Sequence, residues 1–153
     1  MSAFHKIQIH IVFSTLNRRP HILPEWRSEM CGLITAALGE KGQVVLAINA
    51  LPDHVHLFIS QEPECSLTEL VDYAKEISRE FVNGKKVGRQ KFEWQEGFAS
   101  FSYSPSHAEA VIRYINNQLE YHLHTTFEQE MIDMLDMLEV EYTDHELFAW
   151  FGS

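Results

Sequence analysis

The segment VVLAINALPDHVHLFIS (residues 44–60) decides the fold, because it contains two strand-like runs joined by a short turn. In the second run, residues 54–60, side chains alternate between the two faces of a strand. The odd-numbered residues of this run are apolar and share one face, whereas His54 and His56 project together from the other. The segment therefore predicts a β-hairpin that packs on helices and carries two neighbouring imidazoles on its opposite face.

The patterns on either side of this hairpin predict the remaining elements. In chain order they are a strand over Lys6–Ser14, a helix over about Glu25–Lys41, a helix over Ser66–Phe81, a strand over Phe98–Tyr103, a helix from Ser106 to about His124, and a last helix from Thr126 to about Leu138. This order predicts an α+β fold with a ferredoxin-like antiparallel sheet and additional C-terminal helices.

The acidic side chains are concentrated at one end of the chain. The formal net charge is −10, yet residues 127–153 contain eight Asp and Glu and no Lys or Arg. Residues 1–126 then hold 14 acidic against 12 basic side chains, so the body is nearly neutral. We expect one domain over 1–126 and an acidic helical extension, 127–153, packed on it. No broad basic face is visible, and composition alone does not suggest a nucleic-acid partner.

Composition excludes some cellular settings. No apolar run approaches the length that spans a bilayer, and the start of the chain does not resemble a signal peptide. The two cysteines, Cys31 and Cys65, show no metal-ligand spacing and are typical of a reduced protein. We therefore expect a cytoplasmic protein that does not contact membranes.

A polar stripe borders the apolar face of the helix predicted from Ser106. Projection at about 100° per residue places Tyr114 and Gln118 one turn apart at the edge of the apolar arc. By itself this pattern also fits a tyrosine that only extends its hydroxyl to water, and two histidines at i and i+2 also occur by chance. The chemistry becomes specific when the strand and the helix are considered together.

Two imidazoles and a glutamine oxygen can hold one divalent cation without cancelling its charge. A phenol, with a pKa of about 10, is a poor nucleophile at neutral pH unless such a cation lies nearby. His54, His56 and Gln118 around a metal, with Tyr114 as nucleophile, would therefore be suited to attack on a phosphodiester.

The chain resembles the single-tyrosine HUH transposases of small bacterial insertion sequences, which include the REP-associated tyrosine transposases. The resemblance runs through HIVFSTLNRRP (10–20), LPDHVHLFIS (51–60), FEWQEGFASFSYSPS (92–106) and YINNQLEYH (114–122). Several motifs in the same order and at similar spacing make this match much more specific than an isolated His-Val-His.

The resemblance implies a transposase that cuts and rejoins single-stranded DNA through a covalent 5′-phosphotyrosine. It implies Mg²⁺ or Mn²⁺ at His54, His56 and Gln118, and it maps the nucleophile onto Tyr114. It also implies substrate DNA with hairpin ends and a homodimer, in which the tyrosine helix of one subunit completes the other subunit's site in many members. For phosphate contacts we favour Arg18 and Arg19 after the first strand, and Lys75 and Arg79 on the second helix.

Two alternatives remain open at this stage. The first is a catalytically silent or host-domesticated relative that binds single-stranded DNA and keeps the fold. The second is a ferredoxin-like dimer that binds small molecules, or a two-histidine phosphoesterase. The phosphoesterases need two repeated His motifs, and only one His-Val-His strand is present. A silent relative has no physical reason to retain both histidines together with Tyr114 and Gln118.

Overall fold

A computed structural model describes residues 4–85 and 91–152 of the chain. In chain order the elements are β1 (Gln8–Ser14), η1 (Leu16–Arg18), α1 (Pro24–Glu40), β2 (Val44–Ala50), β3 (His54–Ser60), α2 (Leu67–Gly84), β4 (Ala99–Ser102), η2 (Pro105–His107), α3 (Ala108–Asn116), α4 (Gln118–Tyr121), α5 (Phe127–Met137) and α6 (Asp144–Phe151). The β2–β3 hairpin has the bounds that its sequence pattern predicts. None of the helices in the described part of the chain combines the length and apolar character needed to cross a lipid bilayer.

The four strands form one sheet in the order β2-β3-β1-β4, with every neighbouring pair antiparallel. The two central strands, β1 and β3, are joined over their full length, with Val12 opposite His56 and Ser14 opposite His54. A β-α-β-β-α-β order with this arrangement of strands is the ferredoxin-like topology. The predicted α+β fold is confirmed.

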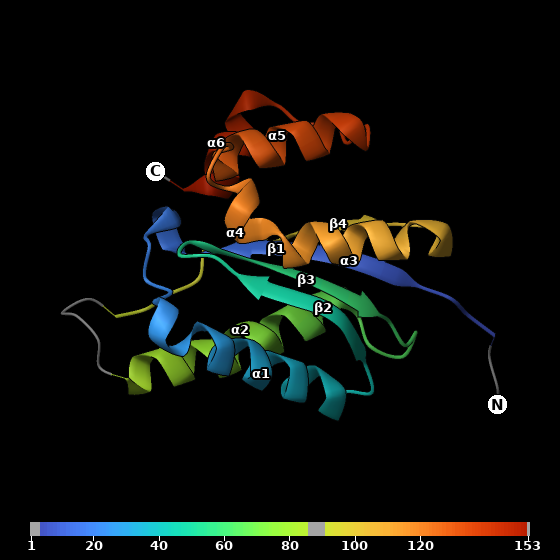
Figure 1. Cartoon of the computed structure of the whole chain (residues 1–153), viewed down its shortest axis with the longest axis horizontal. Coiled ribbons are helices and arrows are strands. Elements are labelled where there is room, and N and C mark those ends of the chain that lie inside the picture. The colour runs from blue at the N-terminus through green and yellow to red at the C-terminus, as the bar shows by residue number, and fades with distance from the viewer. Residues whose placement is uncertain (1–3, 86–90, 153) are drawn as a thin grey trace.

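Helices cover both faces of the sheet (Figure 1). On one side α1 and α2 pack on the apolar row of β3, and Val55, Leu57 and Ile59 are buried in this larger core. On the other side lie α3 to α6, and Val12 of β1 and Phe101 of β4 pack there against Met131 of α5. The acidic extension therefore buries apolar side chains against the sheet, although the domain boundary at residue 126 stays a prediction.

Local sequence signals account for several helix ends. Ser66 accepts a hydrogen bond from the backbone N–H of Glu69 at 3.1 Å and caps α2. Thr126 caps α5 in the same way, accepting from the backbone N–H of Gln129 at 3.1 Å. Gly42 follows α1 with a positive φ of 80°, a conformation that suits glycine after a helix end. The helices predicted from Ser66 and from Thr126 therefore begin next to these residues, as their sequence patterns indicate.

One predicted element is wrong. The sequence predicts a continuous helix from Ser106 to about His124, but the chain leaves helical geometry at Asn117 and divides into α3 and α4. The apolar arc ends there as well, since Leu119 is 49% exposed and Leu123 76% exposed. A side chain from the sheet contacts the helix close to this break. Asn49 of β2 donates a hydrogen bond to the carbonyl oxygen of Ile115 at 2.9 Å.

Candidate active site and metal centre

The two histidines of β3 project from the sheet face that α3, α4 and α5 cover. His54 and His56 are 1% and 0% exposed, and their ring centroids lie 5.1 Å apart. His10 of β1 shares this face, and its Nε2 lies 2.8 Å from Nδ1 of His56. The alternation of side chains along β3 predicted this placement, which follows from the twofold period of a strand.

The break between α3 and α4 determines how the helical residues reach this face. Tyr114 lies in the last turns of α3 and is half-buried, whereas Gln118 begins α4 and is fully buried. The Tyr114 ring lies 5.8 Å from the His56 ring and 6.2 Å from the His10 ring, between centroids. Tyr114 and Gln118 thus lie beside the histidines in the same chain.

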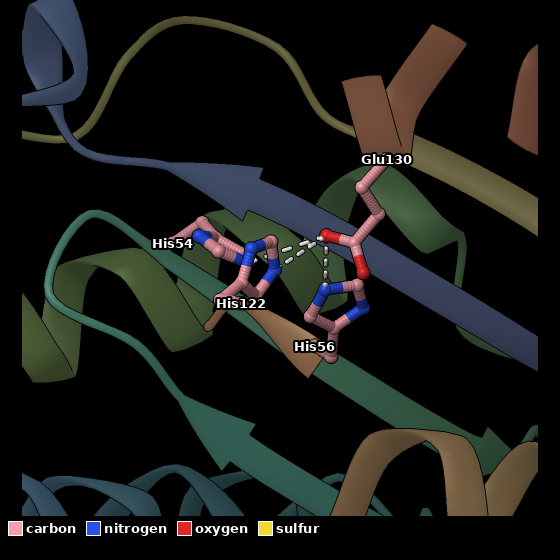
Figure 2. Close-up of side chains that lie close together, drawn as sticks. All are labelled: His54, His56, His122 and Glu130. Carbon is pink, nitrogen blue, oxygen red and sulfur yellow. Dashed lines mark hydrogen bonds and ion pairs between the residues drawn. The ribbon is translucent and has the colours of Figure 1, made fainter. Parts of the chain in front are cut away.

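A carboxylate from the acidic extension lies at the centre of this group (Figure 2). Oε1 of Glu130, on α5, is 3.1 Å from Nε2 of His56, 3.0 Å from Nε2 of His122 and 3.5 Å from Nε2 of His54. Glu130 is 1% exposed. The donor atoms of these four residues all lie within 4.8 Å of one another, so the group could hold a metal ion.

The second oxygen of Glu130 faces the helical residues. Oε2 accepts hydrogen bonds from the hydroxyl of Tyr114 and from Nε2 of Gln118, the latter at 2.8 Å. One carboxylate therefore contacts the two predicted histidines, the predicted glutamine and the predicted tyrosine. Neither Glu130 nor His122 was predicted. His122 ends the quoted motif YINNQLEYH, which is a weak signal, whereas Glu130 is one of eight acids in the extension and has no distinguishing pattern.

Each imidazole of the group is oriented from behind by a partner at Nδ1. Nδ1 of His54 donates to the carboxylate of Asp53 at 2.6 Å, and Nδ1 of His122 donates to the carbonyl oxygen of Thr125 at 2.7 Å. Nδ1 of His56 is held by His10. Outer partners of this kind fix the orientation of histidines that bind metals. As a result all three Nε2 atoms point to Glu130.

Burial and charge shift the pKa values of these groups in different directions. Burial alone would raise the pKa of Glu130, but the nitrogen atoms of His122, His54 and His56 lower it far below its usual range. Burial lowers the pKa of His56 despite the nearby carboxylate of Glu130. Burial also opposes protonation of His54, yet the carboxylates of Asp53 and Glu130 outweigh it and raise its pKa. The carboxylate is therefore ionised and surrounded by imidazoles that differ in proton affinity.

The tyrosine is held in its neutral form. Burial, followed by the negative charge of Glu130, raises the pKa of Tyr114 well above its ordinary value of about 10. A phenol in this environment does not ionise near neutral pH, so it needs additional positive charge nearby before it can act as a nucleophile.

Two buried polar atoms in the site make no hydrogen bond in the described part of the chain, although one of them, Nε2 of His54, lies 3.5 Å from Oε1 of Glu130. Nε2 of His54 and Oε1 of Gln118 make no hydrogen bond there, although both residues are almost completely buried. Buried polar atoms normally form hydrogen bonds, and one that forms none often lies at the binding site of an ion or a water molecule. Both are lone-pair donors of the kind that bind metal ions. The residues thus fit a divalent cation.

An apolar cavity leads to the tyrosine and the carboxylate. Its volume is about 360 Å³, and its walls come mainly from α3, α4 and α5, together with Tyr103, which follows β4. The residues that line it include Tyr103, Val111, Tyr114, Tyr121, Glu130 and Met134. Tyr114 lines this cavity, and the histidines of β3 are not among the described residues that line it.

The predicted phosphate contacts are not gathered at this site. Arg18 pairs with Glu128 of α5, and Arg19 follows directly at the end of η1. Lys75 donates to two backbone carbonyl oxygens, at 2.9 and 2.7 Å, and Arg79 pairs with an acidic side chain at 3.6 Å. Lys75 and Arg79 belong to α2, which covers the opposite face of the sheet from the histidines.

The chain is similar to known proteins in sequence and in fold. The family model described as "Transposase IS200 like" matches residues 3–118 of the chain. A protein of Deinococcus radiodurans R1 that is assigned as a transposase has a similar crystal structure, with a TM-score of 0.62, 18% identity, and coverage of 77% of this chain and 95% of that one.

A second similar structure is that of a REP-associated tyrosine transposase bound to a REP hairpin. Its TM-score is 0.60 at 16% identity, and the match covers 80% of this chain and 74% of that one. At such identities the two structures support the fold. No curated protein matches the chain.

Proposed function

The chain belongs to the IS200-like transposase family, and from that premise we propose that it cleaves and rejoins single-stranded DNA. In this proposal Tyr114 is the nucleophile, and His54, His56 and Gln118 hold a divalent metal. The observation that carries it is the convergence of these groups, from β3, α3 and α4, on the two oxygens of a single carboxylate. Groups that surround an anionic carboxylate are equally suited to the nonbridging oxygens of a phosphodiester, because both accept hydrogen bonds and carry negative charge.

The proposed reaction exchanges one phosphate ester for another. The hydroxyl oxygen of Tyr114 attacks phosphorus and forms a new P–O bond, while the bond from phosphorus to the 3′ oxygen breaks. The products are a 5′-phosphotyrosine and a free 3′-OH, which takes up the proton that the phenol loses. Attack by a 3′-OH on the phosphotyrosine reverses the reaction and rejoins the strand. Because the ester is conserved, neither ATP nor a hydrolytic water is needed.

The surrounding residues orient these groups. Asp53 and His10 hold the rings of His54 and His56 so that Nε2 of each faces Glu130, the carboxylate to which Tyr114 and Gln118 also donate. A bound divalent cation, Mg²⁺ or Mn²⁺ by the resemblance, would stabilise the negative charge on the phosphate and on the attacking oxygen. This positive charge would offset the raised pKa of Tyr114.

We propose single-stranded DNA with hairpin ends as the substrate. The similar REP-associated tyrosine transposase was solved with a REP hairpin, which supports this choice. Arg18, Arg19, Lys75 and Arg79 remain proposed phosphate contacts. Lys75 and Arg79 belong to α2, on the opposite side of the sheet from the helices over the histidines, and would have to bind a distant part of the hairpin. A homodimer also remains a proposal.

Incubation with a hairpin-forming single strand copied from DNA that flanks the gene, with Mg²⁺ or Mn²⁺, tests the function. We expect a covalent protein–DNA adduct on a denaturing gel, and Tyr114→Phe should abolish it while DNA binding is retained. Tyr121→Phe is the matched control, since that ring lies 5.4 Å from the Tyr114 ring, while the side-chain hydrogen bonds to Glu130 in the described part of the chain come from other residues. An adduct formed by Tyr114→Phe would show that Tyr114 is not the nucleophile. DNA binding by the wild type without any adduct would favour a catalytically silent relative.

A further inference from the structure

We propose that His54, His56, His122 and Glu130 form a closed, nitrogen-rich site for a transition-metal ion. In this closed state, Glu130 takes the coordination position that a phosphate oxygen of the substrate would otherwise occupy. The inference rests on the proposed function only for the identity of that substrate. His122 and Glu130 lie beyond residues 3–118, the part of the chain that the family model matches.

The spacing of the four donor atoms is that of ligands around one ion. Bonds of about 2.1 Å in a tetrahedron separate any two donors by about 3.4 Å. Oε1 of Glu130 lies 3.0, 3.1 and 3.5 Å from Nε2 of His122, His56 and His54. No pair among the four is separated by more than 4.8 Å. A small shift of side chains therefore suffices to place one ion between them.

Hydrogen bonds behind the rings leave lone pairs facing the centre. Nδ1 of His54 must donate to the carboxylate of Asp53, and Nδ1 of His122 must donate to a backbone carbonyl oxygen. In a neutral imidazole the other nitrogen then has no proton. Two lone pairs can then face the carboxylate of Glu130, and the three groups are directed at one point. A single divalent ion at that point would satisfy all of these donors at once.

The donor types select the class of metal. Imidazole nitrogens suit Zn²⁺, Co²⁺, Ni²⁺ and Fe²⁺, and a carboxylate is compatible with these and with Mn²⁺. Mg²⁺ prefers oxygen ligands in an octahedral shell and retains several water molecules. Three nitrogen ligands and one oxygen, mostly buried, offer Mg²⁺ neither the oxygen-rich shell nor the water molecules that it prefers. The site should therefore favour transition metals.

The position of Glu130 closes the site against a substrate. Its second oxygen is held by Tyr114 and by Gln118, so the carboxylate is anchored on both sides. His54, His56 and Glu130 are each 1% exposed or less. A phosphate oxygen can reach the ion only when Glu130 withdraws. That movement would also free the amide of Gln118, whose Oε1 has no hydrogen-bond partner in the described part of the chain, to turn toward the ion.

Metal titration of the metal-stripped full chain tests the ligand set without DNA. We expect calorimetry to show binding of Zn²⁺ and Co²⁺ at least about 100-fold tighter than binding of Mg²⁺. The Co²⁺ form should show the intense visible absorption of a four-coordinate ion. Glu130→Gln should weaken Co²⁺ binding by at least about 100-fold, since loss of an outer partner alone costs roughly 10- to 100-fold. If that variant does not fold, His122→Ala, which removes another proposed ligand, should likewise weaken Co²⁺ binding in the same titration.

Glu128→Gln is the matched control, because it makes the same change two residues earlier on α5. The Glu128 side chain is half-exposed and pairs with Arg18 outside the cluster. Its Co²⁺ affinity and spectrum should match the wild type. Equal binding of Mg²⁺ and Zn²⁺ by the wild type, or an unchanged affinity and spectrum with Glu130→Gln, would overturn the proposed site.

Inorganic phosphate then probes whether the site is closed. The spectrum of the wild-type Co²⁺ form should not respond to phosphate, whereas Glu130→Ala should leave an open position that phosphate fills and should change the spectrum. A wild-type spectrum that shifts as readily as the variant's would disprove closure by Glu130. These measurements contain no DNA, so they stand even if the covalent adduct with Tyr114 is never found, and they can fail while the adduct forms.

Discussion

The ring of Tyr114 lies 5.8 Å from the ring of His56, between centroids, and the two planes are nearly perpendicular at 87°. Both residues belong to the same chain, one on α3 and the other on β3. The resemblance to single-tyrosine transposases also allows a tyrosine from one subunit to serve the histidines of another. In this structure the phenol reaches the imidazoles of its own chain.

A complementation experiment should therefore fail to restore activity. When Tyr114→Phe and His56→Ala subunits are mixed and allowed to exchange, we expect no covalent adduct beyond that of each variant alone, because neither chain contains a whole site. Gel analysis with subunits of different lengths would show which chain carries the DNA. Recovery of adduct on the His56→Ala chain would instead mean that its tyrosine serves the partner's histidines.

Removal of an imidazole should affect metal binding and cleavage together. His54→Ala and His56→Ala each delete a proposed ligand, so we expect metal affinity and adduct formation both to fall by at least about tenfold. Tyr114→Phe should abolish the adduct and leave metal affinity within about threefold of the wild type. Calorimetric titration of metal, together with a cleavage assay, distinguishes the loss of a metal ligand from the loss of the nucleophile. Metal affinity unchanged in both histidine variants would refute their role as ligands.

His10 should remain uncharged under mildly acidic conditions. Burial, with repulsion from His56 in addition, lowers the pKa of His10 to about 3. The unfolded chain, with a pKa of about 6.5, therefore binds more protons between these values. The stability that neutral His10 contributes is complete above pH 6.5 and is lost as pH falls toward 3, at no more than about 1.4 kcal/mol per pH unit.

NMR titration of the His10 ring in the folded protein checks this prediction, with the urea-unfolded protein as its control. The folded signal should not move between pH 7 and about pH 4.5, whereas the unfolded signal should titrate with a midpoint near 6.5. A folded midpoint near 6.5 would contradict the effect of burial.

Packing of the extension on the sheet should contribute to the stability of the whole domain. Met131 is 1% exposed and packs in the same cluster as Val12 and Phe101, so Met131→Ala should cost about 2–5 kcal/mol. Met137, on the same helix, is 69% exposed, and Met137→Ala should change stability by less than about 0.5 kcal/mol. Urea unfolding measures both variants. An equally small effect at the two positions would mean that α5 does not pack as described.

Short-range patterns determined much of this fold. The alternation along residues 54–60 placed His54 and His56 on one face because side chains of a strand alternate with a period of two. Ser66 and Thr126 marked helix starts because their hydroxyls satisfy backbone N–H groups within the next turn. Each of these signals depends on residues within a few positions of one another, which is why a single sequence reveals them.

Tertiary structure alone decided the rest of the site. The interruption at Asn117 follows no Pro or Gly, and it coincides with a contact from Asn49, a residue distant in sequence. Glu130 resembles its acidic neighbours in composition, and only the packing of α5 on the sheet brings its carboxylate to the histidines. Periodicity predicts which face of an element is buried, but not which residue of a later helix will lie opposite, because that depends on how separate elements pack together.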